Sequence, residues 1–148
     1  MKLSTKGRYA TRAMLDLALH FGEGPIFLKD IAKRQEVSDR YLEQILIPLK
    51  AGGLVRVVRG ARGGFALAKP PSDIKLIEII RIAEGSTAPV DCVDNAQICS
   101  RSDFCVTREI WSELKHAIDN VLESVTLQNL VDRHGEAERR ASSAKDSR

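Results

Sequence analysis

The sequence predicts a mainly α-helical fold that carries one small β-hairpin. Apolar residues recur at helical spacing through most of the 148 residues, whereas β-branched and aromatic residues flank a glycine-rich turn only in 54–67. Three helical segments precede this hairpin, and a very short connection joins the second to the third. This order of elements is typical of a winged helix-turn-helix. A long amphipathic segment after the hairpin predicts one further helix.

The first three predicted helices cover 5–21, 28–35 and 39–51. A stretch rich in glycine and proline ends the first helix, and Ser38 is a good N-cap for the third. Pro48 removes a backbone hydrogen bond inside the third helix, so we expect a bend, an early end or a last turn held by packing. The apolar stripes behind these predictions are Tyr9, Ala10, Ala13, Met14, Leu17, Ala18 and Phe21, then Leu28, Ile31 and Ala32, then Leu42, Ile45, Leu46 and Leu49.

The segment LVRVVRGARGGFALAK predicts the hairpin. Valines on one side and a Phe-Ala-Leu run on the other favour strands, and three glycines supply the turn between them. Arg59 and Arg62 are then expected at the tip of the hairpin. After the hairpin, Ser72 or Asp73 predicts the cap of a fourth helix over 73–84.

The net charge of +3 conceals two unlike halves. Residues 1–85 carry 15 Lys and Arg against 9 Asp and Glu, whereas residues 86–148 carry 8 against 11. A basic front half indicates a polyanionic partner. An ordinary solvated surface is the alternative interpretation of the charge alone.

The predicted third helix and the hairpin tip suit double-stranded DNA. A helix fits the major groove, where its N-terminal side chains reach base edges, and guanidinium groups are favoured in a narrow minor groove. Many winged helices bind protein instead, and that alternative stays open. The chain has no paired acid and base, nucleophile motif or phosphate-binding loop, so we expect no enzyme. The candidate DNA-binding residues are Lys6, Arg8, Ser38, Arg40, Tyr41, Glu43, Gln44, Arg59 and Arg62.

The long helix in the second half has an apolar stripe too wide for one neighbour to cover. Two copies joined along this helix would bury the stripe and present two reading helices to a palindromic site. An intramolecular core helix is the alternative. The residues expected at the dimer interface are Trp111, Leu114, Ile118 and Leu122.

The pattern divides the chain into four parts. The stretch after the fourth helix is polar and has no period, and the last residues have almost no apolar content, which is typical of disorder. We therefore expect a winged helix-turn-helix domain in 1–85, a cysteine-bearing loop in 86–105, a dimerisation helix with a last short turn in 106–131, and a disordered tail in 132–148.

All three cysteines, Cys92, Cys99 and Cys105, lie in the stretch DCVDNAQICSRSDFC. No apolar run approaches the roughly 20 residues that span a bilayer and no signal peptide is recognisable, so we expect a cytoplasmic protein. In a reducing compartment, clustered cysteines are more often metal ligands or redox thiols than disulfides. Three thiolates on a long polar loop suit an exchangeable iron–sulfur cluster. A zinc ion with a histidine partner and free thiols are the alternatives.

Four stretches together resemble the Rrf2 family of bacterial transcription regulators. They are the opening MKLSTKGRYATRAMLDLA, the segment DIAKRQEVSDRYLEQIL, the wing LVRVVRGARGGFAL, and the three cysteines before a Trp-containing helix. The resemblance extends to about residue 132 and is closest to the iron–sulfur cluster regulators of the family. It implies a homodimeric repressor or activator whose promoter binding depends on an iron–sulfur cluster, with [2Fe–2S] favoured over [4Fe–4S]. Carried across by position, Cys92, Cys99 and Cys105 match the cluster cysteines.

Two features depart from the pattern of those cluster regulators. They have a histidine ligand three residues after the last cysteine, where this chain has Arg108, and the first cysteine gap is one residue longer here. A guanidinium does not ligate iron because it stays protonated. Nitric-oxide sensors of the family use another ligand, so nitric-oxide sensing is an alternative, as is a cluster-free module controlled by thiol redox or a protein partner. Candidates for the fourth ligand are Asp91, Asp94, Asp103, Glu109 or a group on the other subunit's first helix.

Overall fold

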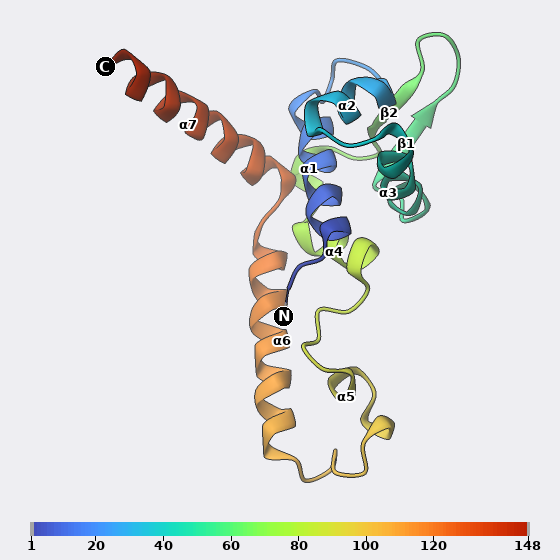
Figure 1. The fold of residues 1–148 in the computed structure, drawn as a ribbon, viewed down its shortest axis with the longest axis vertical. Helices are drawn as coiled ribbons and strands as arrows, with labels where there is room; N and C mark the ends of the chain where they lie inside the picture. Colours follow the sequence, from blue (N-terminus) through green and yellow to red (C-terminus); the bar gives the residue numbers. More distant parts are fainter. Residues whose placement is uncertain (1, 148) are drawn as a thin grey trace.

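The computed structural model describes residues 2–147 and has a mainly helical fold with a two-stranded antiparallel sheet. Figure 1 shows a body formed by α1 to α4 and the hairpin, a long helix α6 that runs away from the body, and a last helix α7 that projects to the side. Within the described part of the chain, no helix is both long and apolar enough to cross a membrane. The elements are α1 (Thr5–Leu19), α2 (Leu28–Gln35), α3 (Asp39–Ala51), β1 (Val55–Val58), β2 (Gly64–Leu67), η1 (Pro71–Asp73), α4 (Leu76–Glu84), α5 (Asp91–Asp94), η2 (Ala96–Ile98), α6 (Val106–Ser124) and α7 (Leu127–Asp146).

The core lies where the stripes of α1 to α4 meet. Met14, Ile31, Leu46 and Ile79 come from these four helices and are each 0% exposed. Burying an aliphatic side chain of this size contributes about 1.5–3 kcal/mol, so this cluster holds the body together. Phe21 is an exception to the predicted stripe: it lies beyond the end of α1 and is half exposed.

The connection between α2 and α3 is a tight left-handed turn. Glu36 has φ 56° and ψ 46°, the left-handed conformation, and ends α2. Two residues later the Ser38 hydroxyl accepts a hydrogen bond of 3.1 Å from the Tyr41 backbone N–H and caps α3. Residues other than glycine adopt the left-handed conformation at a cost of about 1–2 kcal/mol. The chain accepts this strain where the turn sets the angle between the two helices.

The hairpin pairs with the segment between α1 and α2 as well as with itself. Its register joins Val55 to Leu67 and Val58 to Gly64. Ile26 and Phe65 exchange two backbone hydrogen bonds of 2.8 Å, so a third extended segment lies beside β2. A Cβ atom on Gly64 would lie 2.3 Å from the Ile26 carbonyl oxygen, so only glycine allows this approach. The wing is therefore fixed to the body.

An ion pair with a buried carboxylate ties α2 to α1. The Asp16 side chain is 3% exposed and accepts hydrogen bonds of 2.9 and 2.7 Å from the Arg34 guanidinium and of 2.9 Å from the Gln35 amide. Burial alone would raise the pKa of Asp16, but the hydrogen bonds and the charge of Arg34 outweigh burial, so the pKa lies below its ordinary value. His20, whose Nδ1 lies 3.6 Å from the carboxylate, also lowers the pKa of Asp16.

The structure corrects one local prediction in the body and decides another. Neither Ser72 nor Asp73 caps the fourth helix: α4 begins after Lys75, whose backbone N–H donates to the Glu78 carboxylate at 2.8 Å. A short 3-10 turn precedes it. Of the outcomes expected at Pro48, an early end is excluded: α3 continues to Ala51, and Leu49 is buried in the core beyond the proline, as expected for a last turn held by packing.

The end of the chain differs from the predicted short turn and disordered tail. Helix α7 runs from Leu127 to Asp146 and therefore includes most of 132–148. Its first turn is anchored by buried Leu127 and by Thr126, whose hydroxyl accepts from the Asn129 N–H at 3.1 Å. Beyond the anchor the sequence EAERRASSAK is rich in Ala, Glu, Arg and Lys, which favour helix without any apolar contact.

Replacing Glu36 by Gly should stabilise the domain. The glycine relieves the left-handed strain, and after the extra backbone entropy of the unfolded chain we expect a gain of about 0.5–1 kcal/mol. Chemical denaturation measures the change in the free energy of unfolding. Glu36→Ala is the matched control, because it removes the same carboxylate but keeps the Cβ atom, and it should give no gain. Equal stabilisation by both variants would contradict the strain and assign the effect to charge.

Replacing Asp16 by Asn should destabilise the domain by about 1–3 kcal/mol. This cost is smaller than that of breaking a fully buried ion pair, because solvent screens the partly exposed Arg34. Because the folded pKa of Asp16 is lowered, the carboxylate stabilises the protein above the ordinary carboxyl pKa. That stability is lost as pH falls through the folded pKa. The gap in unfolding free energy between wild type and variant should therefore shrink between about pH 5 and pH 2.

Asp30→Asn, at an exposed carboxylate on α2, is the control and should cost little at any pH. Denaturation curves of the wild type and of both variants across this pH range measure the differences in unfolding free energy. A gap between wild type and Asp16→Asn that stays constant down to pH 2 would show that the carboxylate charge does not stabilise the fold.

Candidate functional site

The outer side of α3 carries side chains that the sequence assigns to base reading. Leu42 and Ile45 are buried under the helix, and this leaves Arg40, Glu43 and Gln44 exposed. The cap at the start of α3 fixes the first turn from which these side chains project. One exposed helical surface therefore offers both hydrogen-bond donors and hydrogen-bond acceptors.

Two of the predicted reading residues also have structural roles. The Ser38 hydroxyl is used to cap α3, and Tyr41 is half-buried. The Tyr41 ring meets the Tyr9 ring of α1 edge to face, with centroids 5.9 Å apart. Tyr41 therefore joins the first turn of α3 to α1, a contact that the sequence left open as a packing alternative.

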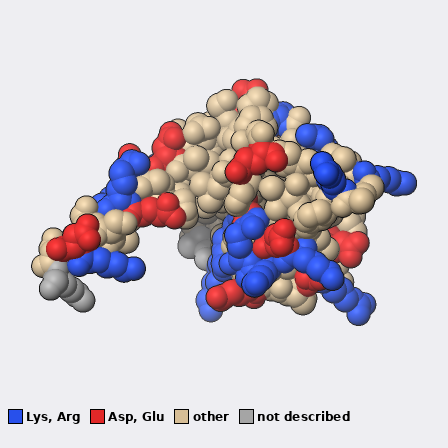
Figure 2. Space-filling model, turned by 90° about the horizontal axis from the view of Figure 1, so that it is seen from above, with Lys and Arg blue, Asp and Glu red and all other residues tan. Residues whose placement is uncertain are grey.

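The hairpin tip presents two arginines to solvent. Arg59 and Arg62 are exposed on the loop between β1 and β2, which extends beyond the body in Figure 1. Gly60 has φ 109°, and a Cβ atom on Gly63 would lie 2.1 Å from the Val58 carbonyl oxygen, so the tip needs both glycines. Figure 2 shows Lys and Arg gathered along one margin of the body, with acidic side chains among them.

The start of α1 adds further basic groups beside α3, the helix that the sequence predicts to read bases and that we call the reading helix. Lys6 and Arg8 are exposed, and an Arg8 guanidinium nitrogen lies 3.3 Å from the Thr5 hydroxyl. The contact between Tyr9 and Tyr41 places this end of α1 next to the start of α3. The candidate DNA-binding residues therefore come from α1, α3 and the wing of one body.

The three cysteines lie on one loop but do not converge in this structure. Cys92 lies in α5, Cys99 follows η2 and is exposed, and Cys105 is the residue before α6. Among residues 2–147, no three His, Cys, Asp or Glu side chains form a group that would hold a metal ion. The Thr107 hydroxyl, 3.1 Å from the sulfur, lowers the pKa of the Cys105 thiol, and the Arg108 backbone N–H and the charge of Arg101 act in the same direction.

The loop is tied along the side of α6. The Arg108 side chain, at the position where the resemblance leads us to expect a histidine, donates a 2.8 Å hydrogen bond to the Cys92 carbonyl oxygen. Lys115 lies 3.4 Å from the Asp94 carboxylate, and the Ser86 hydroxyl and Lys115 together lower the pKa of Asp94. These bonds attach the first half of the loop, around Cys92 and Asp94, to the first half of α6.

Helix α6 has no buried residue, although its apolar stripe is wide. Trp111 is 38% exposed, and Ile110 and Val121 are more than half exposed. Ile118 and Leu122 line a groove of about 790 Å³ between α6, α1 and α4. One side of α6 therefore faces this groove and the other faces solvent.

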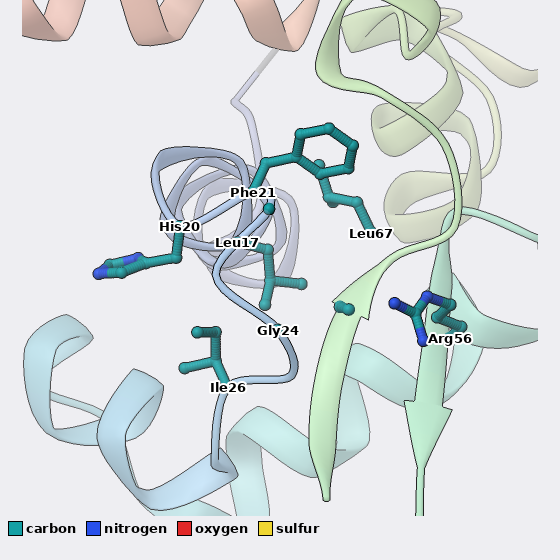
Figure 3. Close-up of a pocket in the computed structure, with 9 residues that line it drawn as sticks. Leu17, His20, Phe21, Gly24, Ile26, Arg56 and Leu67 are labelled. Carbon is teal, nitrogen blue, oxygen red and sulfur yellow. The ribbon is translucent and has the colours of Figure 1, made fainter.

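A second, smaller hollow lies behind the wing and was not anticipated from the sequence. It has a volume of about 320 Å³, and Leu17, Ile26 and Leu67 line it (Figure 3). Arg56 lies on the strand side of the hollow. Its walls come from α1, the segment before α2 and the hairpin, so no local pattern marks it. Within the described residues every buried polar side-chain atom has a partner, so no unpaired buried group points into the hollow.

A comparison with protein families assigns nearly the whole chain. Residues 3–133 match the Rrf2 family, which is described as an iron-dependent transcriptional regulator. The transcriptional regulator CymR of Bacillus subtilis is 41% identical over 131 residues, which is 88% of this chain and 90% of that protein. The regulator IscR of Photorhabdus laumondii is 43% identical over 131 residues, 88% of this chain and 79% of that protein.

Solved structures agree with these relatives. The structure of T. potens IscR superposes with a TM-score of 0.77 at 46% identity and covers 93% of this chain and 90% of its own. The structure of CymR, the global cysteine regulator of B. subtilis, has a TM-score of 0.75 at 40% identity and covers 90% of this chain and 98% of its own. These superpositions confirm the predicted winged-helix fold. The relatives are named as transcription regulators, which confirms the expectation that the chain is no enzyme. This chain belongs to the Rrf2 family of DNA-binding transcription regulators.

Proposed function

We propose that this regulator is a homodimer whose promoter binding is controlled by an iron–sulfur cluster held by Cys92, Cys99 and Cys105. The observation that carries the proposal is the position of Cys105 at the start of α6, the helix with the uncovered apolar stripe. Whatever orders the cysteine loop acts directly on the start of that helix. In the proposed dimer the same helix sets the distance between the two copies of α3.

The donor set fits an iron–sulfur cluster in its chemistry. Three thiols lie within one loop, and thiolates are the ordinary protein ligands of iron–sulfur clusters. Ile98 and Phe104, neighbours of Cys99 and Cys105, are 60% and 73% exposed and are available to shield a cofactor from water. The loop has to draw the three sulfurs together, because they do not form one group as it stands.

A bound cluster would supply a compact, oxygen-sensitive inorganic core that crosslinks the loop. The resemblance favours [2Fe–2S], with [4Fe–4S] as the alternative. Three protein thiolates leave one ligand position for Asp91, Asp94, Asp103, Glu109, the partner subunit or a small molecule. Arg108 does not fill it, because the guanidinium is committed to the Cys92 carbonyl and carries no lone pair for iron. The same proposal places the protein in the cytoplasm, where thiols stay reduced.

The dimer proposal rests on the stripe of α6. Trp111, Leu114, Ile118 and Leu122 recur at helical spacing, and none of them is buried. The groove beside Ile118 and Leu122 is bordered by three basic residues, Lys2, Arg8 and Arg12, and by one acidic residue, Glu84. The sequence of α6 contains four acidic and two basic residues, so a second copy of this helix complements that border in charge. A two-fold dimer then presents two reading helices to a palindromic duplex.

Control by thiol oxidation without a cluster is the second candidate. The thiol of Cys105 has a lowered pKa, and all three cysteines are free. Among similar structures, CymR of Staphylococcus aureus was solved in an oxidised form at 39% identity. Nitric-oxide sensing is a third candidate, which requires the cluster but a different signal.

Replacing Trp111 by Glu should break the dimer. A charge at the first position of the stripe would be buried in the dimer without a partner, so we expect a monomer at micromolar concentration, where the wild type is a dimer, and about 100-fold weaker DNA binding. Analytical ultracentrifugation measures the mass. Asn120→Glu adds the same charge on the opposite side of α6 and should remain a dimer. A wild type that sediments as a monomer on its own and on DNA would contradict the proposal.

Replacing the three cysteines together by Ala should abolish iron and sulfide binding and change the DNase footprint. The wild type, purified without oxygen, should be coloured, contain iron and acid-labile sulfide, and lose its footprint or shift it when the cluster is removed. Ser100→Ala, an exposed change in the same loop, is the control and should behave as wild type.

The outcomes separate the candidates. A footprint that responds only to nitric oxide identifies a nitric-oxide sensor. A colourless protein whose footprint changes with oxidant and returns with dithiothreitol identifies thiol control. An iron-loaded protein with the same footprint as its cluster-free form would contradict control by the cluster.

A further inference from the structure

The Arg12 side chain of α1 contacts the end of α2 and the Tyr9 ring of its own helix. Its Nε donates to the Gln35 side-chain oxygen at 3.0 Å, and a terminal nitrogen donates to the Gln35 backbone oxygen at 3.2 Å. The guanidinium carbon lies 5.0 Å from the centre of the Tyr9 ring, within the range of a cation–π contact. One planar group therefore fixes both the end of α2 and the Tyr9 ring.

Both partners of Arg12 lead to the reading helix. The Tyr9 ring stands edge to face with Tyr41 in the first turn of α3. Gln35 ends α2 immediately before the left-handed turn that leads into α3, and its amide also donates to the buried Asp16 carboxylate. The Tyr9 ring and the end of α2 therefore both adjoin the start of α3.

The same residue borders the groove beside α6. Arg12 lines this groove together with Ile118 and Leu122 of α6 and with Ser86, which begins the segment leading to the cysteine loop. Arg12 is thus placed between the reading helix and the part of the chain that carries the apolar stripe and the thiols.

We infer that Arg12 is a positioning residue for sequence reading, which holds Tyr9 against Tyr41 and thereby sets the first turn of α3 on the DNA. The inference rests on DNA binding by the winged helix and not on the proposed cluster. Lysine is no substitute, because an ammonium lacks the planar fork that donates in two directions while it lies over a ring. A positive charge at residue 12 is therefore not sufficient to hold both Gln35 and the Tyr9 ring.

The test uses the full-length protein and a duplex selected by the wild type from a random-sequence pool. Arg12→Lys keeps the charge and should weaken binding to this duplex about three- to tenfold, the effect of losing one cation–π contact and one hydrogen bond. Affinity for an unrelated duplex should stay unchanged. Arg81→Lys is the matched control, because it makes the same change at an exposed arginine of α4 whose recorded partner is Glu123, and it should alter neither affinity.

A double-mutant cycle tests whether Arg12 acts through Tyr9. Tyr9→Leu removes the ring and should lower specific affinity by a similar factor, and the double variant should be no worse than the poorer single variant. Tyr9→Phe keeps the ring and should retain wild-type affinity. If the losses of specific affinity in the two single variants multiply in the double variant, the inference is overturned.

Three further results would each overturn it in a distinguishable way. If Arg12→Gln lowers specific and unrelated binding together, with the slope of log affinity against log salt reduced by about 0.9, Arg12 is a phosphate contact. If the variants lower the melting temperature but leave the ratio of specific to unrelated affinity unchanged, Arg12 serves only stability. If the wild type selects no sequence at all, the assignment of α3 as a reading helix fails, and this inference fails with it.

Discussion

The uncovered apolar stripe of α6 is the constraint on which the rest of the molecule depends. The core of the body is formed without this stripe: Met14 and Ile79 are fully buried among α1 to α4, and Leu127 of α7 completes the core. The stripe serves no purpose in that core, since α6 has no buried residue. Apolar surface of this extent is covered by association in most proteins. In the proposed dimer this one helix then fixes two things together: the spacing of the reading helices, and the frame to which the cysteine loop is attached.

Polar contacts set the angle of the reading helix within each copy. Asp16 holds Arg34 and Gln35, and Gln35 in turn receives Arg12. A buried carboxylate in the middle of an apolar stripe would be costly without these partners, and with them it fixes one arrangement of α1 against α2. The strained turn at Glu36 comes immediately after Gln35 in the chain. The start of α3 is therefore determined by bonds made before it in the chain, and its exposed side is left free for DNA.

Much of this fold was predictable because its signals are local. Helical spacing located α1 to α4 and α6, and three glycines located the wing. The role of Asp16 was not predicted, because its partners on α2 are set by the turn between the helices. The length of α7 was missed because its later part, which is held by helix propensity alone, has no apolar period. The cysteines were singled out because they cluster in one stretch, but sequence does not tell whether the loop holds the sulfurs apart, as it does here, or together.

The central claim is that two copies joined along α6 read two half-sites. Hydroxyl-radical footprinting of the wild type on a duplex that it selects from a random pool tests this most directly. The account predicts two protected half-sites related by two-fold symmetry, with centres one helical turn apart, about 10–10.5 base pairs, or a multiple of that spacing. Protection of one isolated half-site at saturating protein would contradict it.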